Sequence, residues 1–153
     1  MQDLLNSYFL GTTQEKLQIL NGLIQEKNIK FLFKIFSVSD TDEKKLILEC
    51  LDQGDLNGEF KAIYLEAMRT NSSELFSFMA HTRQYPKSFF TEAEYNQMVL
   101  KALFVDISVQ KIIGIKERKN TKLNTMINDY IEERELANRS LPIGVEEYNN
   151  LGD

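Results

Sequence analysis

Apolar residues recur along this chain at intervals of three and four positions. The clearest stretches lie at 60–68 and 123–131, and shorter ones lie at 17–24 and 46–51. Such spacing is typical of a helix that buries one face. A strict alternation of apolar and polar residues, which a half-buried strand would need, is nowhere sustained. The pattern therefore predicts an all-α protein.

Residues that favour helix starts precede several of these stretches. Thr12 with Glu15, and Thr91 with Glu94, match the capping box, in which a hydroxyl and a carboxylate satisfy free N–H groups of the first turn. Asn71 is a further candidate N-cap, because Asn is favoured at that position. Together with the breaks between stretches, these signals predict helices over 2–9, 13–26, 29–36, 41–52, 59–69, 72–81, 92–105, 108–113, 121–138 and 143–150.

About ten short helices with short connections indicate stacked antiparallel pairs, either an α–α superhelix or an irregular HEAT-like bundle. No repeat of fixed period is present, so a regular tetratricopeptide or ankyrin array is not expected. No low-complexity linker divides the chain, and we expect a single domain over residues 1–153. The tail after Leu141 is expected to be less ordered, because it ends in Asn-Asn-Leu-Gly-Asp.

Composition adds limits on function. A chain of 153 residues can bury a core without help from disulfides or metals. The net charge is −5, whereas nucleic-acid binding usually requires a basic stripe. The basic residues of 111–122 are interrupted by Glu117 and followed by acidic residues, so we expect a solvated face there, with a weak anion or partner contact as the alternative. No nucleic-acid partner is expected.

Cys50 is the only cysteine, and it falls on the apolar side of a predicted helix. We expect it to be a small core residue, and the absence of any possible disulfide within one chain suits a reducing compartment. The N-terminal MQDLLNSYFLG lacks the basic start of a secretory signal. No stretch approaches the ~18 consecutive apolar residues of a membrane span. The expected location is cytoplasmic.

The residues that usually carry chemistry form no recognisable site. His81 is the only histidine, and one histidine with one cysteine does not make a conventional zinc site. No catalytic triad spacing and no glycine-rich phosphate loop is present. We therefore expect a capping or surface role for His81, no metal and no cofactor, and the sequence identifies no catalysed reaction.

The stretch from Arg69 to Phe104 places polar residues between predicted helices and on the apolar face of one of them. Asn96 lies on the same helix face as Leu100 and Phe104, so it points along an apolar stripe. A buried amide without partners costs ~1–3 kcal/mol. Either the stretch is an internal clamp, with Asn96 bound to the 85–89 loop or the 69–71 turn, or it lines a pocket for a ligand or partner. The residues concerned are Arg69, Asn71, His81, Arg83, Tyr85, Pro86, Asn96, Gln97 and Lys101.

The same stretch carries a family resemblance. In EAMRTNSSELFSFMAHTRQYPKSFFTEAEYNQMVLKALF, an Arg-Thr-Asn turn, a Tyr-Pro loop and an Asn-Gln-Met-Val-Leu-Lys-Ala-Leu-Phe helix follow one another. The later DYIEERELANRSLPIGVEEY adds a closing helix and tail. Over about residues 60–150 the sequence resembles the EboA family. It departs from that family's pattern at Arg83-Gln84 and at Glu135-Leu136.

The resemblance implies a biological setting. EboA-like proteins are encoded beside a UbiA-like prenyltransferase, a dehydroquinate-synthase-like enzyme, a TatD-like hydrolase and other enzyme-like proteins, in clusters linked to making or exporting a metabolite. The first hypothesis is a non-catalytic scaffold or adaptor whose partners are other Ebo cluster proteins, and it predicts an exposed groove or apolar patch. The alternative is a cryptic small-molecule binder or enzyme that uses the Arg69–Lys101 region. It requires Arg83, Asn96 and Lys101 to converge on a pocket.

Overall fold

The computed structural model describes residues 2–152 as helices joined by short connections, with no strand in that range. The all-α prediction is therefore confirmed. The helices of the described range are α1 (Gln2–Leu10), α2 (Thr13–Gln25), α3 (Ile29–Val38), α4 (Thr41–Gly54), α5 (Lys61–Met68), α6 (Ser73–Thr82), α7 (Tyr85–Phe89), α8 (Glu92–Phe104), α9 (Ile115–Arg118), α10 (Thr121–Leu136) and α11 (Ile143–Asn149).

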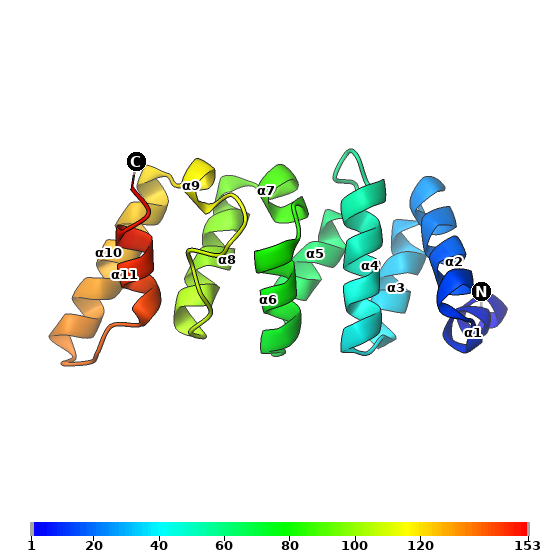
Figure 1. The fold of residues 1–153 in the computed structure, drawn as a ribbon, viewed down its shortest axis with the longest axis horizontal. Coiled ribbons are helices and arrows are strands. Elements are labelled where there is room, and N and C mark those ends of the chain that lie inside the picture. The colour runs from blue at the N-terminus through cyan, green and yellow to red at the C-terminus, as the bar shows by residue number, and fades with distance from the viewer. Residues whose placement is uncertain (1, 153) are drawn as a thin grey trace.

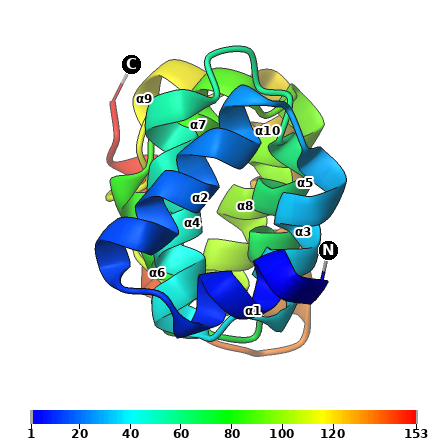
Figure 2. The same ribbon diagram turned by 90° about the vertical axis from the view of Figure 1, so that its right-hand side faces the viewer.

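The helices follow one another along the long axis of the molecule, as the stacked-pair prediction requires (Figure 1). Helices α2, α4 and α6 lie side by side in one row, while α3, α5 and α8 lie behind them. Helix α1 crosses the N-terminal end, and α10 and α11 form the last pair. The view along the stack shows the two rows end-on (Figure 2).

Helix starts follow the sequence signals at most positions. Thr12 and Thr91 each make both hydrogen bonds of a capping box. At α6 the prediction is wrong by one residue, because Ser72 rather than Asn71 is the N-cap. The Ser72 hydroxyl accepts from the Leu75 N–H at 3.2 Å, and Asn71 is exposed.

The expected helix over 108–113 is absent, and this is a correction. The chain makes a series of turns from 105 to 114, and the next helix begins only after Gly114, whose φ of +82° lies in the left-handed region. Figure 1 shows this segment lying across α8, between α6 and α11. It occupies the place that a second helix of the α8 pair would fill.

Contacts with other helices account for the irregular path of 105–114. The Val109 N–H donates to the Glu147 carboxylate at 3.1 Å, and the Ile113 N–H donates to the Ala80 carbonyl at 3.0 Å. In a helix over 108–113 the Ile113 N–H would instead bind the Val109 carbonyl four positions earlier, so its bond to Ala80 replaces a helical turn. The apolar spacing of 108–113 therefore marks buried residues, not a helix. Val109 is fully buried.

Helix α7 is a further departure from the sequence prediction. No helix is predicted between 81 and 92, yet Tyr85–Phe89 form a short helix. Pro86 lies in its first turn, where a missing N–H costs no hydrogen bond, and its carbonyl accepts from the Phe90 N–H at 3.1 Å.

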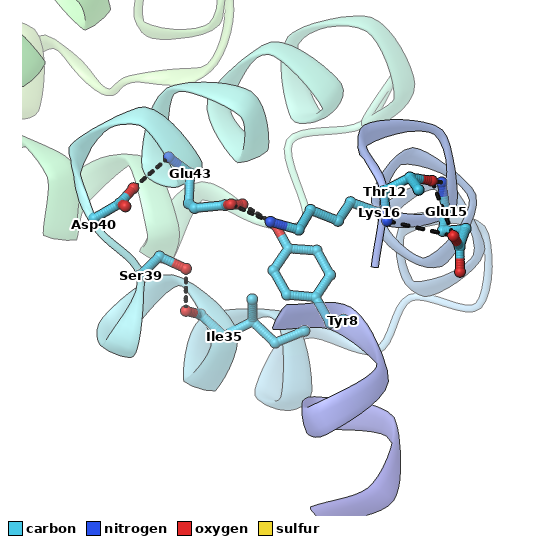
Figure 3. A network of polar contacts seen from close by, with 8 residues as sticks. All are labelled: Tyr8, Thr12, Glu15, Lys16, Ile35, Ser39, Asp40 and Glu43. Carbon is cyan, nitrogen blue, oxygen red and sulfur yellow. Dashed lines mark hydrogen bonds and ion pairs between the residues drawn. The ribbon is translucent and has the colours of Figure 1, made fainter. Parts of the chain in front are cut away.

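At the N-terminal end, a buried tyrosine joins three helices (Figure 3). The Tyr8 hydroxyl of α1 donates to the Glu43 carboxylate of α4 at 2.9 Å. Lys16 of α2 forms an ion pair with the same carboxylate, and its ammonium lies 5.5 Å from the centre of the Tyr8 ring. Burial raises the pKa of the Tyr8 hydroxyl, and the Glu43 carboxylate adds to the rise. This network fixes α1 across the first helix pair.

One continuous apolar core runs through the described residues, and Cys50 lies in it, as expected, with 5% of its surface exposed. Within residues 2–152, no helix combines the length and the apolar character needed to cross a bilayer. The largest fully buried side chains include Tyr8, Phe36, Phe60, Tyr64, Phe76, Tyr85 and Tyr95.

Candidate functional site

The start of α7, which carries the Tyr-Pro pair, is fixed to the connection between α4 and α5. Tyr85 is 1% exposed, and its hydroxyl donates to Asp55 Oδ2 at 2.5 Å. Asp55 is itself buried and also accepts from the backbone N–H groups of Phe60 at 2.8 Å and Glu59 at 3.1 Å. The Tyr85 ring stacks on Tyr64 with centroids 4.0 Å apart. Burial raises the pKa of the Tyr85 hydroxyl, and the Asp55 bond raises it further.

The two residues before Tyr85 contact the same carboxylate on α4. The Arg83 guanidinium lies 3.6 Å from Asp52 Oδ2, and the Gln84 N–H donates to that oxygen at 3.1 Å. The guanidinium also covers the Phe78 ring at 5.1 Å. Arg83 and Gln84 therefore form an additional contact between the start of α7 and α4.

Asn96 of α8 is 1% exposed, which confirms that it points into the apolar interior. Its partner is Asn120, not the 85–89 loop or the 69–71 turn, so that part of the prediction is wrong. The Asn120 amide donates to Asn96 Oδ1 at 2.8 Å, and the Asn96 amide donates back at 3.3 Å. Asn120 is also the N-cap of α10, where its side chain accepts from the Leu123 N–H at 2.8 Å. The pair joins α8 to the start of α10.

Arg118 is the one residue of the basic run with a clear internal role, which corrects the expectation of a wholly solvated face. Its guanidinium donates to the carbonyls of Lys87 at 2.7 Å and Phe90 at 2.8 Å. The same group lies 4.6 Å from the centre of the Tyr95 ring. Arg118 thus connects α9 to the ends of α7 and α8.

Lys101 binds the carboxyl end of α5. Its ammonium donates to the carbonyls of Met68 and Thr70, the latter at 2.6 Å, and lies 5.0 Å from the centre of the Phe76 ring. A cation here satisfies carbonyls that have no partner within the helix. Burial lowers the pKa of the Lys101 ammonium.

His81 lies in the last turn of α6 and is only partly exposed. Its Nε2 donates to the Ser108 carbonyl at 2.7 Å, so it binds the irregular segment. The sequence had suggested a capping or surface role instead. Arg69 is exposed and pairs with Glu66 at 3.2 Å. Asn71 and Gln97 are exposed. Pro86 is buried in α7.

Arg83, Asn96 and Lys101 do not converge on one pocket. They bind α4, the start of α10 and the end of α5, respectively. Among the described residues, every buried side-chain nitrogen or oxygen has a hydrogen-bond partner. No group of three or more His, Cys, Asp and Glu side chains in residues 2–152 is placed to hold a metal ion.

A hollow lies instead at the C-terminal end of the stack, and the sequence did not identify it. Its volume is about 520 Å³, and it lies between the end of α8, α10 and the α10–α11 connection. Phe104 is 59% exposed and Ile143 is 68% exposed. The hollow is lined by Leu103, Phe104, Asp106, Tyr130, Arg134, Ser140, Leu141, Pro142 and Ile143.

Side-chain contacts organise the wall of this hollow. The rings of Phe104 and Tyr130 lie 5.1 Å apart at 54° to each other. The Arg134 guanidinium lies 5.7 Å from the Tyr130 ring centre, and its Nε and Nη2 donate to the Ser140 carbonyl at 2.9 and 2.5 Å. Leu141 lies in the connection before α11 and Ile143 is the first residue of that helix, so neither belongs to a run of helical spacing long enough to select it.

Comparison with known proteins gives one match. A family model described as metabolite traffic protein EboA matches residues 15–147. The match covers both the Arg69–Phe104 stretch and all of the hollow's lining. No curated protein and no solved structure matches the chain.

Proposed function

The chain belongs to the EboA family, and on that premise we propose that it is a non-catalytic helical adaptor in metabolite traffic. Its partners are the other proteins of an Ebo-type pathway, namely the prenyltransferase-like, dehydroquinate-synthase-like and hydrolase-like members, and it acts in the cytoplasm. The family description supports the metabolite setting.

One observation carries this proposal: the polar residues of the central stretch are used to hold the stack together. Tyr85 is bound by Asp55, Asn96 by Asn120, and Lys101 binds the end of α5. A catalytic residue needs an accessible partner in the substrate, whereas Tyr85 and Asn96 are each 1% exposed. The stretch therefore favours a structural role over a reactive one.

The proposed partner surface is the C-terminal edge of the stack. Large apolar side chains are exposed there, and contiguous exposed apolar surface commonly marks interaction sites. A stack of helix pairs also presents long faces to partner proteins. The exposed apolar residues of this edge are Phe104, Val105, Leu136, Leu141 and Ile143.

Co-purification tests the proposal with a matched pair of variants. Leu136 and Leu56 are 81% and 80% exposed, and only Leu136 lies at the C-terminal edge, whereas Leu56 lies between α4 and α5. The tagged chain is expressed with the neighbouring pathway proteins and purified at native levels. We expect Leu136→Asp to lose the partner and Leu56→Asp to retain it. A wild-type chain that purifies alone, with all the neighbours present, would contradict the adaptor role.

A further inference from the structure

The hollow beside α8 and α10 has the volume of a small-molecule site. Pockets for such ligands usually measure about 300–1,000 Å³, and this one measures about 520 Å³ and is lined by both polar and apolar groups. Phe104 and Tyr130 supply two ring faces or edges for stacking. Phe104 is 59% exposed, so its ring is accessible to a ligand.

Two charged residues line the hollow, and they have opposite signs. Arg134 is held in place because Nε and Nη2 bind the Ser140 carbonyl, while Nη1 makes no hydrogen bond with residues 2–152. A guanidinium fixed in this way can donate to a ligand oxygen. Asp106 is exposed, and its carboxylate disfavours a second negative charge nearby.

We propose that this hollow binds a neutral, apolar ring compound that carries a hydrogen-bond-accepting oxygen. The ring lies against Phe104 and Tyr130, and the oxygen accepts from Arg134. Neutrality follows from the lining, since Arg134 favours an acceptor while Asp106 repels an anion. The inference rests on the proposed function in one respect, which is that the natural ligand is a metabolite. To that function it adds the binding surface and the chemical class of the ligand.

Three fluorescent probes test the ligand class on the purified chain without any partner protein. Prodan is a neutral naphthalene with a carbonyl, N-phenyl-1-naphthylamine is a neutral naphthalene without one, and 1-anilinonaphthalene-8-sulfonate is an anion. We expect saturable binding of Prodan at one site. Asp106→Asn should tighten the binding of the sulfonate, because it removes a like charge and tolerates the φ of +61° at this position.

Matched variants locate the probe. Phe104→Ala should weaken both neutral probes by roughly fivefold, because it removes part of the apolar wall, while Leu56→Ala, an equally simple truncation of an exposed side chain, should leave both unchanged. The unmodified protein should bind Prodan more tightly than the carbonyl-free probe, because only Prodan offers a carbonyl oxygen to Arg134. Arg134→Met should abolish this preference, and Arg134→Lys should keep part of it because a donor remains.

Several results would overturn the proposal. They are the absence of saturable Prodan binding, equal weakening by Phe104→Ala and Leu56→Ala, and a preference for Prodan that persists in Arg134→Met. None of these results depends on a partner protein, so they leave the co-purification test unaffected. Conversely, loss of partner capture in Leu136→Asp says nothing about probe binding, because Leu136 does not line the hollow.

Discussion

Removal of the Asp55 carboxylate should destabilise the fold more than any exposed substitution. Asp55 accepts hydrogen bonds from Tyr85, Phe60 and Glu59, and it is 6% exposed. Asp55→Ala leaves the Tyr85 hydroxyl and the Phe60 N–H buried without a partner. Each such group costs ~1–3 kcal/mol, so the two together should cost ~2–6 kcal/mol. That is a large share of the ~5–15 kcal/mol that stabilises a typical protein.

Tyr85→Phe isolates a single bond of this cluster. It keeps the ring that stacks on Tyr64 at 4.0 Å and leaves Asp55 with its two backbone donors. The expected loss is ~1.5–3 kcal/mol, the range for a hydrogen bond to a charged group. Tyr130→Phe is the matched control, because the Tyr130 hydroxyl makes no hydrogen bond within residues 2–152, and we expect a change within ~0.5 kcal/mol.

Urea unfolding followed by circular dichroism measures these free energies. The double variant completes a cycle, and residues in direct contact should show a coupling of ~0.5–3 kcal/mol. If the changes in unfolding free energy of Asp55→Ala and Tyr85→Phe were both as small as that of the Tyr130→Phe control, buried hydrogen bonds would not be holding the start of α7 in place. The clamp interpretation would then be wrong.

Other substitutions test separate parts of the structure. Gly114→Ala should destabilise by more than ~1 kcal/mol in urea unfolding, because φ is +82° and an added Cβ would lie 2.6 Å from a lysine side chain; Gly22→Ala, with open space in a helix, should stabilise by ~0.5–1 kcal/mol. Lys101→Met should cost ~1–2 kcal/mol by the same measurement, because the carbonyl of Thr70 loses a charged donor while the apolar stem is retained. The pKa of the Tyr85 hydroxyl is raised in the folded state, whereas in the unfolded chain this hydroxyl ionises near pH ~10. Above that pH the folded state therefore binds more protons than the unfolded state, and the free energy of unfolding should fall as the pH rises. The urea midpoint should fall less steeply with pH in Tyr85→Phe.

Local signals in the sequence were sufficient for most of the helices. The capping boxes at Thr12 and Thr91 form as expected, because they depend on residues three positions apart. Asn96 was also correctly placed in the interior from its i, i+4 neighbours. Its partner Asn120 is 24 positions away and on another helix. No local pattern specifies that meeting, so the identity of the partner could not be predicted.

The errors share a cause. The 108–113 segment has helical spacing, but residues of α6 and α11 take its backbone N–H groups. The hollow was missed because its lining comes from the end of α8, from α10 and from the chain that leads into α11, which are far apart in the sequence. Tertiary contacts decide both features, and a pattern of single-residue propensities does not contain them.

The irregular segment 105–114, which replaces a helix beside α8, separates two parts of the molecule that should differ in the free energy of local opening. On its N-terminal side, α4 buries Ile47, Leu48, Cys50 and Leu51, whereas on its C-terminal side the sixteen residues of α10 bury only Leu123 and Ile127. Helix α11 packs on α8, and its Glu147 binds the irregular segment. Regions with fewer buried contacts open at lower free energy. Amide hydrogen exchange should therefore divide the chain into two cooperative units, with α10 and α11 exchanging as one faster block.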